Sequence, residues 1–370
     1  MIKTDAVIIG AGPVGLFQLF QLGLLGVKAD IIDVLPEPGG QCAALYPDKP
    51  IYDIPGVPVC TGRELTQRLL AQARPFLPQH PGDDRPANLH LGAQVSSLSA
   101  HPTGFELTTT TGQRFHTWTV FIAAGAGAFV PKALAIPGVP TDASAAALTG
   151  AQGSDALPPN LHHHLPPDGT AAPWAGQHLV IAGGGDDALQ TVLDILAAPA
   201  PQRPDRLTLL HRRDQFQAEA ALDAQVRGLI AQGVVTLALG VPSGATRDAG
   251  DHRLLSLTLL GASGEQLLPL DHLLVRQGLS PKLGPIADWG LHLDRKQVVV
   301  DTATFATSIE GLYAVGDINT YPGKKRLILC GFHEATMAAH AASSRLQPDA
   351  PQHLQYTTTS SLLQQRLGVK

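Results

Sequence analysis

The sequence predicts an α/β fold of two three-layer domains, the first of which is interrupted by the second. The chain has 370 residues, more than one hydrophobic core usually accommodates. A short apolar run, a glycine-rich turn and a longer apolar segment occur in this order twice. Segments that alternate between apolar and polar residues follow each copy, which is typical of small antiparallel β meanders.

The first copy spans residues 5–34. Residues 5–10 (DAVIIG) are apolar and β-branched like a buried strand, residues 14–26 have the length and spacing of a helix, and residues 29–34 predict a second strand. This order is the first unit of a parallel α/β sheet. Residues 98–121 alternate and predict an antiparallel meander.

The second copy has strands at residues 177–185 and 206–211, joined by a helix over 186–198. Residues 253–274 alternate again, and residues 278–281 (GLSP) predict a turn at which the chain returns to the first domain. We therefore expect one domain to comprise residues 1–122 and 284–370 and the other residues 123–283. Residues 141–175 lack a period and predict a loop insertion with a short buried piece around LHHHL.

Composition excludes several classes of protein. A net charge of −5 and a pI near 6.3 give no basic footprint for nucleic acid. No apolar run approaches the roughly 20 residues that a membrane-spanning helix needs, and the N-terminus lacks the pattern of a secretory signal. Three cysteines, Cys42, Cys60 and Cys330, lie far apart, which favours a reducing compartment. We expect a soluble cytoplasmic protein.

The first glycine turn, GAGPVG, has the spacing of a dinucleotide-binding turn. Gly10 allows a tight turn, Gly12 lets the backbone approach a diphosphate, and Gly15 lets the helix pack on the strand. The helix N-terminus then presents unpaired N–H groups to the phosphates. Asp33 ends the next strand, where a carboxylate accepts hydrogen bonds from ribose hydroxyls. The alternative to a nucleotide site is an ordinary glycine turn followed by a solvent-exposed carboxylate at the end of a strand.

The second turn, GGGDDA, repeats this spacing with Gly183, Gly185 and Ala188. Both domains are therefore predicted to be Rossmann-like and to bind one dinucleotide each. The next strand ends in a cationic cluster, His211, Arg212 and Arg213, rather than an acid. Because guanidinium groups bind phosphate and carboxylates repel it, NADPH is expected here rather than NADH. The alternative is a solvated basic strand end.

Three stretches resemble the thioredoxin-reductase-like flavoproteins and, within them, the ferredoxin-NADP reductases of that fold. Residues 39–56 (GGQCAALYPDKPIYDIPG) resemble the flavin loop of these enzymes. Residues 207–219 (LTLLHRRDQFQAE) resemble their NADPH loop, and residues 311–342 resemble the segment that brings a Gly-Asp pair to the flavin. With the glycine turns, these stretches cover most of the chain.

The resemblance implies FAD at the first turn and NADPH at the second. It implies that Tyr46 stacks on one flavin face, that Asp317 binds the ribityl chain, and that a homodimer partner's tail covers the other face with Tyr356. The FAD contacts expected from motif and resemblance together are Gly10, Gly12, Pro13, Val14, Gly15, Asp33, Gln41, Tyr46, Ile51, Val95, Ala124, Asp317, Ile318, Tyr356 and Thr358. Those expected for NADP are Gly183, Gly185, Asp186, Ala188, His211, Arg212 and Arg213.

Some features limit the resemblance. Gln217 stands where the wider group often has a further arginine, which leaves two arginines for the 2′-phosphate. No cysteine occurs between residues 125 and 183, where a thioredoxin reductase carries its Cys-x-x-Cys pair, so disulfide reduction by that route is excluded. His162, His163 and His164 are consecutive and are not expected to bind a metal.

The sequence therefore predicts a ferredoxin or flavodoxin NADP reductase in which hydride passes between NADPH and FAD and single electrons pass to a small redox protein. We expect no catalytic side chain, because the flavin performs the chemistry. Lys324, Lys325 and Arg326 could steer an acidic partner. An NADPH-dependent reductase of a quinone or other small acceptor, and a redox-silent flavin-binding sensor, remain alternatives.

Overall fold

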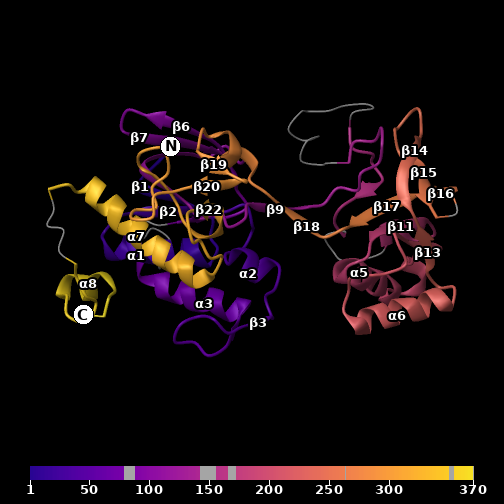
Figure 1. Ribbon diagram of the computed structural model, residues 1–370, viewed down its shortest axis with the longest axis horizontal. Helices are drawn as coiled ribbons and strands as arrows, with labels where there is room; N and C mark the ends of the chain where they lie inside the picture. The colour runs from indigo at the N-terminus through magenta and orange to yellow at the C-terminus, as the bar shows by residue number, and fades with distance from the viewer. Residues whose placement is uncertain (79–87, 142–155, 166–171, 263, 350–353, 370) are drawn as a thin grey trace. The chain divides into compact units, whose positions relative to one another are not determined.

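The computed structural model describes residues 1–78, 88–141, 156–165, 172–262, 264–349 and 354–369. The chain divides into two compact units (Figure 1): unit 1 comprises Met1–Ala128 and Pro281–Lys370, and unit 2 comprises Phe129–Ser280. Each unit combines a parallel sheet with helices and antiparallel strands, so the predicted α/β fold class is confirmed. The longest described helix has 19 residues, and none of the described helices is long and apolar enough to cross a membrane.

Unit 1 is built on a seven-stranded sheet in the order β5-β2-β1-β8-β7-β6, with β21 beside β8. The bounds of these strands are β1 Ile2–Ile9, β2 Ala29–Ile32, β5 Leu89–His90, β6 Val95–His101, β7 Gly104–Thr109, β8 Arg114–Ile122 and β21 Leu312–Ala314. The meander predicted over residues 98–121 is present, but it is not a separate sheet, because β8 also pairs in parallel with β1. The chain order reverses at β1, which has β2 on one side and β8 on the other.

Helices α1 (Pro13–Leu24), α3 (Gly62–Ala73) and α7 (Ile328–Leu346) lie together on one side of this sheet in Figure 1. Gly12 is the N-cap of α1 and Pro13 its first residue, a position at which proline costs no hydrogen bond. Four alanines of α7 with no exposed surface, Ala335, Ala338, Ala339 and Ala342, belong to the core of unit 1. Helix α7 begins at Ile328.

The remaining elements of unit 1 are short. They are α2 Gly40–Ala44, β3 Pro50–Ile51, β4 Cys60–Thr61, η1 Arg74–Phe76, η5 Gly284–Asp288, β19 Leu293–Asp294, β20 Gln297–Val299, η6 Gly316–Ile318, β22 Asn319–Thr320 and α8 Ser361–Arg366. The Thr61 hydroxyl and the Glu64 carboxylate form a capping box that starts α3. Residues 278–281, predicted as a turn, lead instead into strand β18 (Leu279–Lys282), so the chain returns to unit 1 in an extended conformation.

Unit 2 has a five-stranded parallel sheet in the order β10-β17-β11-β12-β13 and a separate antiparallel sheet, β14-β15-β16. The elements are β9 Ala128–Pro131, β10 Leu161–His162, η3 Ala172–Trp174, β11 His178–Gly183, α5 Asp186–Ala197, η4 Ala200–Gln202, β12 Arg206–His211, α6 Ala220–Ala231, β13 Thr236–Leu239, β14 Val241–Arg247, β15 Leu254–Gly261, β16 Gly264–Pro269 and β17 His272–Arg276. The predicted second meander therefore forms a sheet of its own, while β17 joins the parallel sheet.

The central strand β11 shows why unit 2 has three layers. Leu179 and Ile181 pack in one core with residues of α5, whereas Val180 and Ala182 pack in another core with residues of β15. This division follows from the two-residue repeat of a strand. Helices thus cover one face of the parallel sheet, and the antiparallel sheet covers the other.

The loop predicted over residues 141–175 is only partly described. Residues 142–155 and 166–171 lie outside the described residues. Within LHHHL, Leu161 and His162 form β10, an edge strand that pairs in parallel with β17. The buried piece expected around LHHHL is therefore present, with Leu161 in the sheet core, and its first two residues form a strand.

Candidate nucleotide-binding sites

The first glycine turn follows β1 and is packed too tightly for larger residues at two positions. A Cβ at Gly15 would lie 1.8 Å from the carbonyl oxygen of Gly10. A Cβ at Gly10, whose φ is +112°, would lie 2.4 Å from the carbonyl oxygen of Ala123 and 3.2 Å from the Cα of Ala124. At Gly12 the nearest heavy atom would be 3.8 Å away. Packing does not demand glycine at Gly12, so the open space at the N-terminus of α1 fits a diphosphate.

Asp33 is joined directly to this turn. Its carboxylate accepts hydrogen bonds from the backbone N–H of Ala11 (2.5 Å) and that of Leu35 (2.8 Å). The side chain is 8% exposed, and burial raises its pKa above the ordinary value of 3.8. Its carbonyl accepts the N–H of Ala93, two residues before the buried Val95. The carboxylate is thus placed to accept further hydrogen bonds, as a ribose would require.

A third segment reaches this turn from far along the sequence. A Cβ at Gly316 would lie 3.3 Å from the side chain of Val14, so the backbone at Gly316 packs closely against that side chain. The next residue, Asp317, is half-buried, and its carboxylate has no hydrogen bond or ion pair among the described residues. Burial raises the pKa of Asp317, while Lys324 and Arg326 lower it. The following residue, Ile318, is buried.

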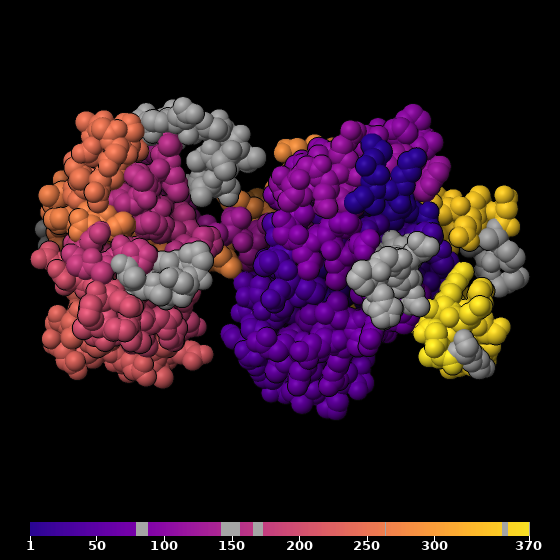
Figure 2. All heavy atoms as spheres, turned by 180° about the vertical axis from the view of Figure 1, so that it is seen from behind, coloured from indigo at the N-terminus to yellow at the C-terminus, as the bar shows by residue number. Residues whose placement is uncertain are grey.

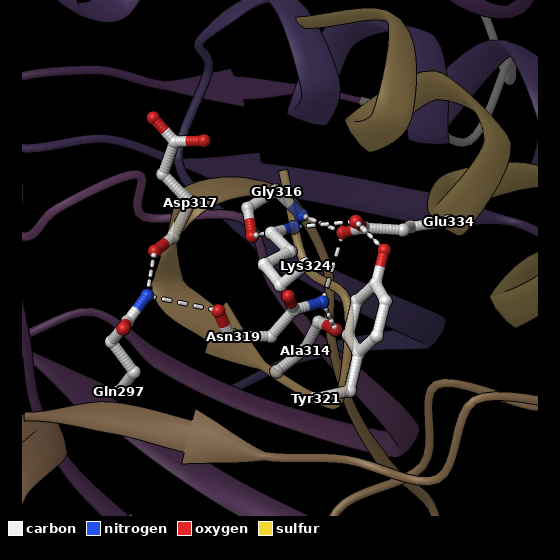
Figure 3. A network of polar contacts seen from close by, with 8 residues as sticks. All are labelled: Gln297, Ala314, Gly316, Asp317, Asn319, Tyr321, Lys324 and Glu334. Atoms are coloured by element: carbon white, nitrogen blue, oxygen red, sulfur yellow. Dashed lines mark hydrogen bonds and ion pairs between the residues drawn. The ribbon is translucent and has the colours of Figure 1, made fainter. Parts of the chain in front are cut away.

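A buried carboxylate, Glu334, fixes the conformation of this segment (Figure 3). Its Oε2 accepts the backbone N–H of Gly316 (2.7 Å) and Nδ2 of Asn319 (2.8 Å). Its Oε1 accepts the hydroxyl of Tyr321 (3.0 Å) and pairs with Nζ of Lys324. Lys324 Nζ also donates to the Gly316 carbonyl (2.9 Å). In Figure 3 the Asp317 carboxylate points away from this network, which leaves it available to a ligand.

The same network corrects one sequence-based expectation. Only 7% of the Lys324 side chain is exposed, so this lysine belongs to a buried ion pair and cannot serve in a steering patch. Lys325 and Arg326 are exposed. Burial, followed by the neighbouring Glu334, raises the pKa of Tyr321 to about 12, so its hydroxyl stays a donor at neutral pH.

The predicted flavin loop begins at α2. The side chain of Gln41 lies close to Gly125, which follows Ala124. A Cβ at Gly125 would lie 3.1 Å from Gln41 Nε2. The Cys42 thiol donates to the hydroxyl of Tyr46 (3.6 Å), and burial raises the pKa of Tyr46. Ile51 pairs with Cys60 across the short β3-β4 hairpin. Residues from four separate parts of unit 1 are thus brought to the carboxyl end of β1 and β8.

The C-terminal tail is placed elsewhere. Tyr356 is 62% exposed, and its carbonyl accepts the N–H of Ser360 in the turn that contains Thr358. Helix α8 follows this turn, and Arg366 donates to the carbonyl of Leu24 at the last turn of α1 (2.5 Å). The 12 residues of α1 separate this point from the first glycine turn by about 18 Å. Figure 2 shows the tail, in yellow, at the surface.

The second glycine turn is built in the same way as the first. A Cβ at Gly183 would lie 2.2 Å from the carbonyl oxygen of Arg276 and 2.7 Å from the Cβ of Ala188. A Cβ at Gly184 would meet the His211 ring at 2.5 Å, whereas at Gly185 the nearest atom would be 3.7 Å away. The middle position is again open, and Gly185 caps α5. Burial lowers the pKa of His211, so its neutral ring packs on the turn.

A cleft of about 610 Å³ opens at this turn, within unit 2. Three cationic side chains line it: Lys132, Arg212 and Arg276. Arg212 and Arg213 are both exposed, and neither guanidinium has a hydrogen bond or ion pair within the part of the chain that the structure describes. Arg213 is not among the lining residues, so the structure separates two residues that the sequence treats as one cluster.

Two hydrogen bonds connect the second glycine turn and the start of α5 with the segment around Gln217. The backbone N–H of Gln217 donates to the carbonyl of Gly184 (2.7 Å), and Asp186 accepts the N–H of Glu219 (2.7 Å). The side chain of Gln217 is exposed. Lys132 and Arg276 were missed at the sequence level. Arg276 could have been noticed because it ends the apolar run HLLVR, where a charged residue at the end of a strand can face a ligand. No sequence signal pointed to Lys132.

Comparison with known proteins agrees with this geometry. The family model described as pyridine nucleotide-disulphide oxidoreductase matches residues 4–345. The chain belongs to this family. A relative named ferredoxin--NADP reductase, from Paracidovorax citrulli, is 50% identical over 376 residues and covers 100% of this chain and 97% of its own. Another of that name, from Acidovorax sp., is 51% identical and covers 99% and 96%. The resemblance stated from the motifs is confirmed, and the chain is an oxidoreductase.

Solved structures show the same fold. A bacillithiol disulfide reductase from Staphylococcus aureus aligns with a TM-score of 0.58 at 16% identity and covers 95% of this chain and 100% of its own. A thioredoxin reductase from T. acidophilum aligns with a TM-score of 0.52 at 20% identity, with coverages of 94% and 99%. At these identities the likeness concerns the fold alone.

Within this family of disulphide oxidoreductases, the cysteines of the present chain are unsuited to dithiol chemistry. Cys42 and Cys60 are buried and Cys330 is half-buried; all three are free thiols. Burial raises the pKa of Cys42, which keeps it protonated and weakly nucleophilic. The described residues contain no group of three or more potential metal ligands. His162 instead bonds His272 (3.0 Å), and burial lowers its pKa to about 4.

Proposed function

We propose that this oxidoreductase is a ferredoxin or flavodoxin NADP reductase, with FAD in unit 1 and NADPH in unit 2. One observation carries the proposal. Two glycine turns, one joined to a buried acid and one followed by an unpaired cation, occur in a chain about half identical throughout to relatives of that name. Bound FAD supplies the chemistry, since it accepts hydride from a nicotinamide and gives up electrons singly.

The chain's own part is to bind and orient two nucleotides. In unit 1 the open space at Gly12 accommodates the diphosphate, Asp33 accepts ribose hydroxyls, and Asp317 accepts hydroxyls of the ribityl chain. We assign the flavin ring to the neighbourhood of Gln41 and Tyr46. The other proposed FAD contacts are Gly10, Pro13, Val14, Gly15, Ile51, Val95, Ala124 and Ile318.

In unit 2 we assign the diphosphate to the N-terminus of α5 and the 2′-phosphate to Arg212. Arg213 is exposed and outside the cleft lining, so we assign it a minor part. The other proposed NADP contacts are Gly183, Gly185, Asp186, Ala188 and His211. Discrimination between NADPH and NADH then depends chiefly on one guanidinium, whose charge-assisted bonds to phosphate have no counterpart on a ribose hydroxyl.

We further propose a cytoplasmic homodimer in which the tail of one chain serves the flavin of its partner. The docking of Arg366 at the far end of α1 supports a contact in trans, because it holds the Tyr356 turn away from the chain's own glycine turn. Tyr356 and Thr358 are then the residues that meet the partner's flavin. Sedimentation of the full chain and of a chain ending at residue 349 tests the dimer.

Steady-state assays with different acceptors test the proposed activity. The FAD-loaded protein is supplied with NADPH and, in turn, a ferredoxin, a flavodoxin or a soluble quinone. The proposal predicts that kcat/KM is at least about tenfold higher with ferredoxin or flavodoxin than with the quinone. A preference for the quinone would identify a small-acceptor reductase instead, and no turnover with any of the three would indicate a redox-silent flavoprotein.

A further inference from the structure

Two aspartates stand where unit 2 is proposed to bind a diphosphate. Asp186 and Asp187 are the first residues of α5, where acids favour helix formation. The first glycine turn has the uncharged Pro13 and Val14 at the corresponding positions. Because carboxylates repel phosphate, an NADPH site at this turn requires that their charges be offset.

Both carboxylates, Asp186 and Asp187, have hydrogen-bond or ion-pair partners within unit 2. Asp186 accepts the N–H of Glu219 (2.7 Å). Asp187 pairs with Nη2 of Arg276, whose Nε donates to the hydroxyl of Thr191 (3.2 Å). The Thr191 hydroxyl in turn donates to the carbonyl of Asp187 (2.6 Å). The Arg276 guanidinium is therefore held on one face of α5, within the cleft lining.

The backbone of Arg276 places it at the expected ligand position. Arg276 is the last residue of β17 and lies opposite Gly183 in the register with β11. The neighbours of β11 are β17 on one side and β12 on the other, so the chain order reverses there. In open α/β sheets, ligands bind outside the carboxyl ends of the strands at such a point.

We propose that Arg276 is a positioning residue for the diphosphate of the nicotinamide nucleotide, and that it acts by neutralising Asp187. This inference rests on the function proposed above. Because the diphosphate is common to NADPH and NADH, Arg276 supports the binding of both, whereas Arg212 distinguishes them. The two arginines of one cleft thus have separable effects.

Binding of NADP⁺ and of NAD⁺ to the FAD-loaded full-length chain, measured by calorimetry at low ionic strength, tests this. Arg276→Gln leaves Asp187 uncompensated, and we expect the Kd to rise at least about tenfold for both nucleotides. Asp187→Asn combined with Arg276→Gln restores neutrality, so its Kd should return to within about threefold of the unmodified protein. Asp187→Asn alone should bind equally well or more tightly.

A matched control is Arg206→Gln, which removes the same charge from the first residue of β12, at the opposite end of the sheet. Its Kd values should stay within about twofold. An Arg276→Gln protein that binds normally, a double variant as weak as Arg276→Gln, or an Asp187→Asn protein with weakened binding would each overturn the inference. If the unmodified protein binds neither nucleotide, the proposed function fails instead.

Discussion

The glycine turns of units 1 and 2 agree at their first two motif positions and differ at the third and beyond. Gly10 and Gly183 are both too close to neighbouring backbone to carry a Cβ. At the third position unit 1 has Gly15, and unit 2 has Ala188. The strand that follows ends in a buried acid in unit 1 and an exposed cation in unit 2. Steric closeness therefore maintains the turn, and we expect the charge after it to select the nucleotide.

The sites also differ in how they are assembled. The proposed unit 1 site includes the returning segment around Gly316, which the buried Glu334 holds in place. The unit 2 site is formed by β11, β12 and β17 within one continuous stretch of chain. Variants of the returning segment should thus affect FAD alone.

The third motif position gives the largest expected effect. Gly15→Ala would place a methyl group 1.8 Å from a carbonyl oxygen, and we expect it to lower the free energy of unfolding by at least about 4 kcal/mol. Ala188→Gly should cost only about 1 kcal/mol. Chemical denaturation with flavin content as a second readout measures both. Equal losses would mean that the two turns are packed alike after all.

Glu334→Gln should separate the two sites. Breaking a buried ion pair by removing one partner costs about 3 kcal/mol. FAD affinity should fall because the single amide oxygen cannot accept from Gly316 and Asn319 on one side and from Tyr321 and Lys324 on the other. NADP⁺ affinity should remain within about twofold. Adding Lys324→Met removes the uncompensated charge and should recover part of the stability. Unchanged flavin retention in the single variant would show that this network does not support the FAD site.

Asp33→Asn should weaken FAD binding about 10- to 100-fold, since an amide accepts fewer hydrogen bonds than a carboxylate. The FAD-free protein should show a pH dependence that reports this group. Burial raises the pKa of Asp33, so the group's contribution to stability is present below its ordinary pKa and is lost as pH rises through the folded value. The Tm of the unmodified FAD-free protein should therefore fall over this pH range, and the Tm of Asp33→Asn should lack that fall. The same pH dependence in both proteins would contradict this.

Arg212→Ala should lower kcat/KM for NADPH by about tenfold and leave that for NADH nearly unchanged, since a charge-assisted bond to the 2′-phosphate contributes about 1.4 kcal/mol or more. Arg213→Ala should change either value by no more than about twofold, because Arg213 does not line the cleft. Steady-state kinetics of both variants with NADPH and NADH measure these effects. The reverse order would place the 2′-phosphate at Arg213.

The smallest effect is expected from the cysteines. Replacing Cys42, Cys60 and Cys330 with alanine should leave NADPH oxidation by an artificial acceptor within about twofold, apart from a modest loss of stability from the two buried positions. Loss of turnover with the flavin still bound would reveal a thiol step.

Local sequence signals were enough to predict the two glycine turns and the residues that follow the next strands. They were not enough to predict features that depend on contacts between distant parts of the chain. Gly10, Gly15 and Gly183 could be identified because their role depends on the adjacent strand and helix. Lys324 was misassigned to the surface, because its partner Glu334 lies ten residues away and is buried only in the folded chain. Arg276 was missed because only the strand order places it beside Gly183. The buried piece around LHHHL was predicted, but not that Leu161–His162 is a strand, since this strand forms by pairing with β17.

Anaerobic mixing of the FAD-loaded protein with one equivalent of NADPH, and separately of NADH, tests the central claim most directly. The account predicts that NADPH bleaches the flavin absorbance of each chain and that Arg212→Ala slows this much more than it slows bleaching by NADH. Bleaching by NADH as fast as by NADPH in the unmodified protein, or no bleaching by either, would contradict the assignment of the cationic turn to NADPH.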